Sequence, residues 1–229
     1  SSPADGSAAA AAARIVVLGG TGKIGTAVAA HLSHRLSSPT IRERHSLPDD
    51  CEIVLVGRQP PSDDGGDNDR FREALLEIDE LLELSSSTSS EKGRSDPSLR
   101  PRISYEFVPD IWEPGALDGV LLGGSGPPVA CVVHTAGPYA DRAGPTVLDA
   151  CIDFKIPVYV DVSDPVDFLE DSLQRNDSAV AAGTTAVLAA GAFPGMSNVL
   201  ALEAAATAAA MTTPDDGAPQ TTTTTTTNV

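Results

Sequence analysis

The stretch LGGTGKIG, residues 18–25, decides the fold. It follows an apolar run and precedes a helical pattern that opens at Gly22. Gly20, Gly22 and Gly25 have the G-x-G-x-x-G spacing of a dinucleotide-binding turn between a strand and a helix. In such a turn, Gly20 makes the tight bend, Gly22 lets the backbone approach a pyrophosphate, and Gly25 lets the helix lie close to the sheet. Unpaired N–H groups and the helix dipole then favour the anion.

The Gly22-Lys23 pair also resembles the end of a triphosphate-binding loop, which has the pattern G-x-x-x-x-G-K-[ST]. Val17 stands where that pattern needs its first glycine, and Ile24 stands where it needs a magnesium-binding hydroxyl. The triphosphate interpretation therefore fails at both ends. We expect the whole turn to contact a dinucleotide cofactor: Gly19, Gly20, Thr21, Gly22, Lys23, Ile24 and Gly25.

Apolar, β-branched runs recur along the chain and alternate with helical patterns. The runs predict strands at Arg14–Leu18, Glu52–Val56, Ile103–Val108, Val129–His134, Val158–Val162 and Ala186–Ala190. One helical pattern begins at Gly22, and four more cover about 69–84, 114–122, 144–154 and 194–211. The first of these helices is expected to bury Ile24, Val28 and Leu32, and the second Phe71, Leu75, Ile78 and Leu82. This alternation predicts an α/β fold with a doubly wound parallel sheet, a Rossmann fold.

Three kinds of segment fall outside this alternation. Residues 37–50 and 85–101 are predicted to be insertions into a domain that spans 14–211, and the second of them is Ser-rich. Residues 1–13 are expected to form a disordered leader, and residues 212–229 a disordered, Thr-rich tail. We predict no regular structure in any of these segments.

The composition excludes several classes of partner. The net charge is −17, and such an acidic surface repels nucleic acid and anionic membranes. No apolar run reaches the ~18 residues of a membrane-spanning helix. The three cysteines, Cys51, Cys131 and Cys151, are odd in number and lack CxxC spacing, which argues against a disulfide framework and against a metal site. We expect buried thiols and a cytoplasmic protein, or an organellar one such as a plastid protein if the N-terminus is a trimmed targeting segment.

The residue that ends the second predicted strand indicates which dinucleotide binds. NAD sites usually place Asp or Glu there, whereas this chain has Gly57-Arg58. Arg58 can bind a 2′-phosphate, so the sequence predicts NADP rather than NAD. Asp110, after the third predicted strand, is expected to accept a hydrogen bond from the adenine amino group.

Further motifs add a family resemblance. HTAGPY (134–139), GPTVLDAC (144–151), VYVDVSD (158–164) and GAFPGMSN (191–198) follow VLGGTGKIG and LVGR in this order. Together they resemble the NADP-binding domain of the saccharopine dehydrogenase-like family, over nearly all of residues 14–210 apart from the insertions. The resemblance implies that one segment runs along the cofactor toward the nicotinamide: Thr135, Ala136, Gly137, Pro138 and Tyr139.

The resemblance also implies a partner domain. Members of that family carry a second α/β domain, which supplies much of the substrate pocket and often the dimer contact. Here the sequence becomes Thr-rich after Met211 instead. We therefore expect a small-molecule substrate, and a homodimer formed through a second domain that is missing from this sequence.

The residues do not single out a catalytic group. His134, Tyr139, Asp141, Tyr159 and Asp161 fall near the expected active edge, but none has a partner at a diagnostic spacing. We expect His134 to pack within its strand and Asp161 to contact polar substrate. Three hypotheses stay open: an NADP(H)-dependent oxidoreductase, a non-catalytic NADP(H)-binding sensor or partner module, and an inactive fragment of a larger enzyme.

Overall fold

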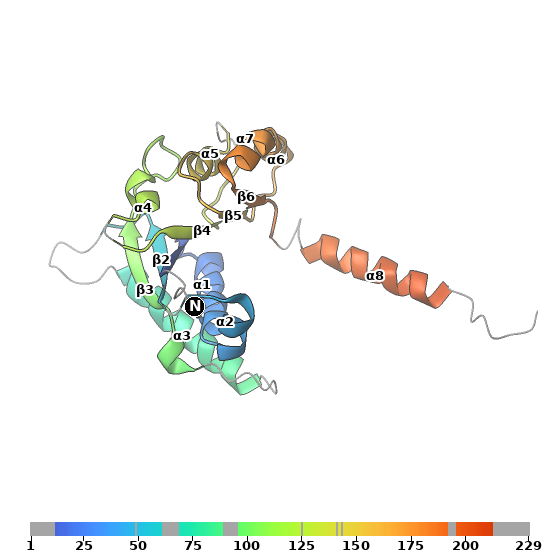
Figure 1. The fold of residues 1–229 in the computed structure, drawn as a ribbon, viewed down its shortest axis with the longest axis horizontal. Helices are drawn as coiled ribbons and strands as arrows, with labels where there is room; N and C mark the ends of the chain where they lie inside the picture. The colour runs from blue at the N-terminus through green and yellow to red at the C-terminus, as the bar shows by residue number, and fades with distance from the viewer. Residues whose placement is uncertain are drawn as a thin grey trace, which may run out of the picture.

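The computed structural model describes residues 12–48, 50–60, 69–88, 96–124, 126–140, 142, 144–191 and 196–212. Within this part of the chain, six strands pair in one sheet with the order β3-β2-β1-β4-β5-β6 (Figure 1), and every pairing is parallel. The strands are β1 (Ala13–Leu18), β2 (Cys51–Gly57), β3 (Arg102–Phe107), β4 (Val129–His134), β5 (Val158–Asp161) and β6 (Thr185–Val187). This arrangement confirms the predicted doubly wound, Rossmann-like α/β fold.

Helices connect the described strands, and one more helix follows the last of them. They are α1 (Lys23–Leu36), α2 (Pro39–His45), α3 (Asp69–Thr88), the 3₁₀ helix η1 (Pro97–Leu99), α4 (Asp118–Leu122), α5 (Thr146–Asp153), α6 (Val166–Leu173), α7 (Asn176–Ala182) and α8 (Ser197–Thr212). Figure 1 shows α8 extending away from the remaining elements.

The sheet separates two apolar cores. Val16 and Leu18 of β1 point to the core shared with α4, α5 and α7, whereas Val17 points to the core shared with α1 and α3. All seven residues of β2 are buried, as expected for a central parallel strand covered on both faces. The apolar run of β2 is therefore continuous because both faces of this central strand are covered.

Helix α1 does not bury the stripe that its large apolar residues predict. Ile24 is 54% exposed, and Val28 and Leu32 are only half-buried. The buried face consists of smaller residues instead: Gly25, Thr26, Ala29, Ala30 and Ser33, with Leu36 at the end. Small residues let the helix axis approach the glycine turn and the sheet, so close approach outweighs the burial of large side chains here.

The insertion at 37–50 contains a helix, contrary to our prediction of no regular structure. It contains α2, and Arg42 on that helix is buried although it is charged. The Arg42 guanidinium donates to the carbonyls of Leu36, of Pro48 at 2.5 Å and of Leu99 at 2.8 Å. Because Leu99 belongs to the second insertion, one arginine joins the two insertions through backbone carbonyls.

The second insertion, 85–101, is also partly regular. Helix α3 continues to Thr88, and Asp96 caps η1 by accepting a hydrogen bond from the Ser98 N–H at 2.8 Å. Residues 89–95 lie outside the described residues, as do 1–11 of the predicted leader and 213–229 of the predicted tail.

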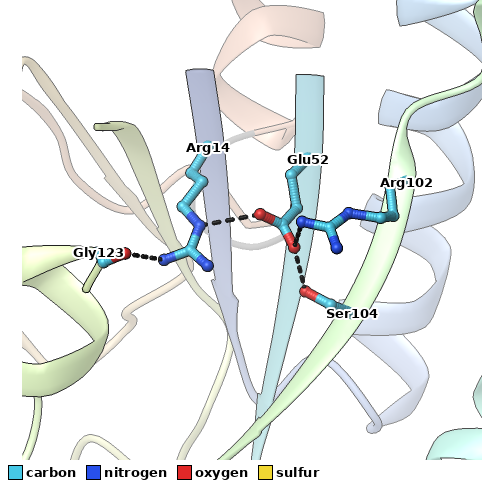
Figure 2. A network of polar contacts seen from close by, with 5 residues as sticks. All are labelled: Arg14, Glu52, Arg102, Ser104 and Gly123. Atoms are coloured by element: carbon cyan, nitrogen blue, oxygen red, sulfur yellow. Dashed lines mark hydrogen bonds and ion pairs between the residues drawn. The ribbon is translucent and has the colours of Figure 1, made fainter. Parts of the chain in front are cut away.

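A polar network ties the amino ends of the first three strands (Figure 2). Glu52 is 3% exposed and accepts from Arg14 Nε at 2.9 Å, Arg102 Nη2 at 2.9 Å and Ser104 Oγ at 2.7 Å. Arg14 also donates to the Gly123 carbonyl at the end of α4. The network lies at the edge opposite the glycine turn and fixes the strand register there.

Candidate functional site

The glycine turn joins β1 to α1 at the carboxyl edge of the sheet. Gly19, with φ +74°, takes the left-handed conformation, so the bend lies one residue before the position that the motif predicts. Gly20 instead permits a close approach, because a Cβ there would lie 2.8 Å from the Leu55 Cα on β2. The N–H groups of both glycines bond to the Val56 carbonyl at 2.9 and 3.1 Å, which anchors the turn to β2.

The first turn of α1 has no side-chain cap. Gly22 is its N-cap and provides no side-chain hydrogen bond to the first turn of the helix. A Cβ on Gly22 would meet only the Gly19 carbonyl oxygen, at 3.2 Å, whereas a Cβ on Gly25 would overlap that oxygen and lie 2.7 Å from the Gly20 Cα. Gly25 is therefore required for packing within the turn, while a side chain at Gly22 would have a single close neighbour.

A cavity of about 900 Å³ lies in front of this turn. Its walls come from the turn, the end of β2, the start of α3 and the segments that follow β3 and β4. The predicted cofactor residues that line it are Gly19, Thr21, Gly22, Lys23, Arg58, Asp110, Thr135, Ala136 and Gly137. Gly20, Ile24, Gly25, Pro138 and Tyr139 are outside its lining.

Several lining residues were not predicted from the sequence. The most informative are Gln59, Arg70, Glu73, Trp112 and Arg142. Gln59 follows β2 directly, and its carbonyl accepts a hydrogen bond from the Tyr105 hydroxyl at 2.6 Å. The position after a strand was an available signal for Gln59, but no local pattern placed α3 beside the turn.

The cavity collects positive charge in an acidic chain. Its lining holds four cations, Lys23, Arg58, Arg70 and Arg142, beside three carboxylates. The whole chain has 15 basic and 32 acidic residues. Cations therefore outnumber carboxylates in the cavity lining, although carboxylates predominate in the chain. Basic residues and an open helix N-terminus both favour an anionic ligand at this edge.

The side chains of Arg58 and Arg142 differ in their contacts with the rest of the protein. Arg58 is exposed at the end of β2, and within the described residues no hydrogen bond or ion pair of its guanidinium occurs. Arg142 stacks over the Trp112 ring at 4.7 Å and donates from Nε to the Pro138 carbonyl at 3.0 Å. Asp110 accepts from the Trp112 N–H at 3.0 Å, so one of its oxygens already fixes the turn.

Tyr139 packs away from the cavity, in an aromatic cluster. It is 6% exposed, and its hydroxyl donates to the His134 carbonyl at 2.5 Å. Its ring lies 4.9 Å from His134, 5.2 Å from Phe168 and 5.8 Å from Trp112, between ring centroids. Burial and the nearby Asp161 charge raise the pKa of Tyr139 well above its ordinary value, so this phenol stays protonated.

His134 is fully buried at the end of β4, as expected for a packed strand residue. Its Nε2 lies 3.2 Å from the Ala136 carbonyl oxygen, and its Nδ1 lies 3.2 Å from the Tyr159 hydroxyl. Burial lowers the pKa of His134 to about 3, although the contact with Ala136 opposes the shift. The imidazole is thus neutral at physiological pH.

Asp161 is buried rather than open to substrate, which corrects our expectation. Its Oδ1 accepts from the Ser163 hydroxyl at 2.7 Å, the Ser163 N–H at 3.2 Å and the Ala189 N–H at 2.9 Å. Its Oδ2 accepts from Tyr159 at 3.1 Å. The carboxylate joins the segments that follow β5 and β6. Asp141 lies outside the described residues.

The cysteines and acidic residues form no metal centre in the described part of the chain. Cys51 and Cys151 are buried and Cys131 is half-buried, and none of these three described cysteines forms a disulfide. Burial raises the pKa of Cys131 to about 11 and that of Cys151 to about 12. Among the described helices, none is both long and apolar enough to cross a membrane.

Comparison with known proteins gives only distant likeness. No protein-family model matches the sequence, and no curated protein matches it significantly. A ketoreductase from the first module of phoslactomycin biosynthesis in Streptomyces sp. HK803 is 19% identical, with a TM-score of 0.39 over 78% of this chain and 41% of its own. Shikimate dehydrogenase from Mycobacterium tuberculosis is 14% identical, with a TM-score of 0.33 over 79% and 45%.

Gre2 from Candida albicans is 20% identical, with a TM-score of 0.32 over 65% of this chain and 35% of that protein. The chain thus spans less than half the length of these solved structures. At such TM-scores the likeness carries no argument about function.

Proposed function

We propose that this chain is the NADP(H)-binding domain of an oxidoreductase that acts on a small metabolite. The observation that carries the proposal is the strand–glycine turn–helix unit opening onto a cavity of about 900 Å³. In open parallel α/β sheets, ligands bind at the carboxyl ends of the strands, where this cavity lies.

The residues around the turn suit a dinucleotide. The space beside Gly22 is one that a larger side chain would fill, and the first turn of α1, which has no side-chain cap, begins there. A pyrophosphate could be held there by these groups, with Lys23 nearby. Thr135, Ala136 and Gly137 line the cavity beyond the turn and would lie along the cofactor.

Arg58 supports the choice of NADP over NAD. It stands at the end of β2, where the adenosine ribose is usually recognised, and it has no competing partner in the described part of the chain. A charge-assisted hydrogen bond to a 2′-phosphate contributes roughly 1.5–3 kcal/mol, or about tenfold to hundredfold in affinity. Asp110, across the cavity, is the proposed partner of the adenine amino group.

The order of the later motifs supports a saccharopine dehydrogenase-like enzyme type. When bound, the nicotinamide would supply or accept the hydride. The backbone of residues 135–137 would orient the nicotinamide. Thr135 Oγ1 donates a hydrogen bond to the Leu18 carbonyl at 2.8 Å, which holds this segment beside the glycine turn. Substrate contacts and a homodimer interface would come from a second domain.

One observation favours a non-catalytic NADP(H)-binding module as the second candidate. The polar groups considered for proton transfer and included in the described residues are committed to internal contacts. His134 is neutral and buried, Tyr139 donates to a backbone carbonyl, and Asp161 accepts several hydrogen bonds. An enzyme built on this chain would therefore take its proton donor from elsewhere, whereas a sensor needs none.

The test is a titration with NADPH and with NADH. The chain has one tryptophan, Trp112, and it lines the cavity, so its fluorescence reports binding directly. We expect NADPH to bind about tenfold to hundredfold more tightly than NADH. Arg58→Ala should remove most of that difference and leave NADH binding nearly unchanged.

Arg44→Ala is the matched control, because Arg44 is also an exposed arginine but lies on α2, outside the cavity. It should keep the wild-type preference. Equal affinities of the wild type for NADPH and NADH would contradict the role of Arg58. A screen for turnover with imines, amino-acid semialdehydes and enoyl substrates then separates an enzyme from a binding module.

A further inference from the structure

Among the described residues, helices cover one face of the sheet over only part of its width. On the side of α1 and α3, the register places Val17, Val133, Val160 and Val187 in one row across β1, β4, β5 and β6. Val17 is 0% exposed and Val133 9%, Val160 is half-buried, and Val187 is 45% exposed. Burial therefore falls with each strand away from α1, and β5 and β6 present an apolar face to solvent.

A second row shows the same trend. Ile15, Cys131, Val158 and Thr185 are aligned by the register; the first three are half-buried and the last is exposed. Cys131, Val133 and Val160 already contribute to the core beneath α1 and α3. The open face, which we define as Val158, Val160, Thr185 and Val187, is thus continuous with an established core. It carries no charged side chain.

Helix α8 carries large apolar side chains that are exposed rather than buried in a core. Val199 is 55% exposed, Leu200 62% and Leu202 71%. Among its sixteen residues, Glu203 alone is charged. Val199, Leu202 and Ala206 share one side of the helix, and Leu200 and Ala204 lie nearly opposite. A helix that is apolar on two sides is normally buried.

The connection between β6 and α8 is long enough to let these two surfaces meet. Strand β6 ends at Val187 on the carboxyl edge and α8 begins at Ser197, so nine residues connect them. Nine residues can reach about 30 Å, well beyond the ~10 Å that separates a helix layer from a sheet. Each earlier connection also leaves the carboxyl edge and returns through a helix, so α8 could continue the layer of α1 without crossing another element.

From these observations we infer that α8 of the same chain docks on the open face. Its Val199–Leu202–Ala206 side packs against Val160 and Val187, beside α1, in an arrangement different from the extended one of Figure 1. Leu200 then faces outward. The inference concerns a different surface from the cofactor cavity and does not depend on the proposed function.

Disulfide trapping in the full chain tests this docking. We compare Val160→Cys with Leu202→Cys against Val160→Cys with Leu200→Cys, both with Cys131→Val to remove the neighbouring thiol. After mild oxidation, we expect an intrachain disulfide in the Leu202→Cys pair and a several-fold lower yield in the Leu200→Cys pair. Non-reducing electrophoresis and peptide mass spectrometry identify the product.

Three outcomes would overturn the inference. Absence of an intrachain disulfide in the Leu202→Cys pair means that α8 does not reach the face. Equal disulfide yields in both pairs mean that α8 contacts the open face without presenting one defined side of the helix to it. A disulfide-linked dimer means that α8 docks on a second copy instead. As a measurement without cysteines, Leu202→Asp should increase the binding of an apolar dye more than Leu200→Asp does, and equal increases would contradict the docking.

Discussion

At the residue scale, Gly22 and Gly25 have different tasks although both belong to one motif. A Cβ at Gly25 would overlap the Gly19 carbonyl oxygen, whereas a Cβ at Gly22 has only one neighbour, at 3.2 Å. The motif predicts a different close approach at each glycine, to a pyrophosphate at Gly22 and to the sheet at Gly25. Their difference depends on the path of the turn, which bends at Gly19.

We predict that Gly25→Ala destabilises the fold by about 1–3 kcal/mol, because the turn must shift to admit a methyl group. Urea unfolding measures the change. The matched control is Gly119→Ala on α4, where an added Cβ meets nothing within 4 Å. Gly119→Ala should be neutral or stabilising by up to about 1 kcal/mol. A Gly25→Ala variant as stable as the wild type would show that the turn is looser than described.

His134 should not titrate between pH 5 and 8, because burial lowers its pKa to about 3. NMR chemical shifts of its ring protons should stay constant over that range. The unfolded chain binds this proton near pH 6.5, so the folded state loses stability as the pH falls below 6.5. The slope approaches about 1.4 kcal/mol per pH unit. A midpoint near pH 6.5 in the folded protein would contradict the buried, neutral assignment.

Tyr139 and Asp161 show where sequence reasoning about the site stops. Tyr139 follows β4 and Asp161 ends β5, and both were candidates for cofactor or substrate contact. The structure directs Tyr139 into an aromatic cluster and surrounds Asp161 with donors from Ser163, Ala189 and Tyr159. Sequence predicts at which edge a residue lies, but the side-chain direction depends on neighbours that are distant in the chain.

At the element scale, the strands were predictable because both of their faces are apolar. The six predicted runs and the six strands agree to within three residues at each end. Helices were less predictable. The buried face of α1 uses Ala29 and Ala30 rather than Ile24, because close packing favours small residues. Helix α2 was missed because its stability depends on Arg42 and on a carbonyl of Leu99, 57 residues further along.

The polar network in Figure 2 gives a prediction at this scale. Burial tends to raise the pKa of Glu52, but hydrogen bonds from Ser104 and Arg14 and the charges of Arg14 and Arg102 outweigh it and hold the pKa below 4.5. Its stabilisation is therefore fully present above pH 4.5 and is lost as the pH falls through the lowered value.

We expect Glu52→Gln to cost roughly 1.5–3 kcal/mol of unfolding free energy at pH 7, because Arg14 is only 12% exposed and would lose its charged partner. Denaturant titration at pH 7 and at pH 3 measures this, and the loss should be smaller at pH 3. Glu73→Gln, which removes an ion pair with both side chains 66% exposed, should cost about 0–1 kcal/mol. Equal losses in the two variants would contradict the role of burial.

At the scale of the whole molecule, the charge distribution separates the cavity from the rest of the surface. The chain carries −17 overall, yet its cavity has more cations than carboxylates. Composition alone predicts an acidic surface and gives no sign of this local reversal. The fold creates it by bringing Lys23, Arg58, Arg70 and Arg142 from four segments to one edge of the sheet. A dinucleotide with several phosphates is the ligand class that such a cavity favours.

The most direct test of the central claim is the affinity for NADPH, read from Trp112 fluorescence, in the wild type and in Gly22→Val. We predict binding by the wild type and by Gly119→Val, a glycine-to-valine control in open space. Gly22→Val should remain folded, because its backbone at φ −92° and ψ 164° accepts a β-branched residue, but its side chain fills the space for the pyrophosphate. Undiminished NADPH affinity in a folded Gly22→Val variant would contradict a dinucleotide site at this turn.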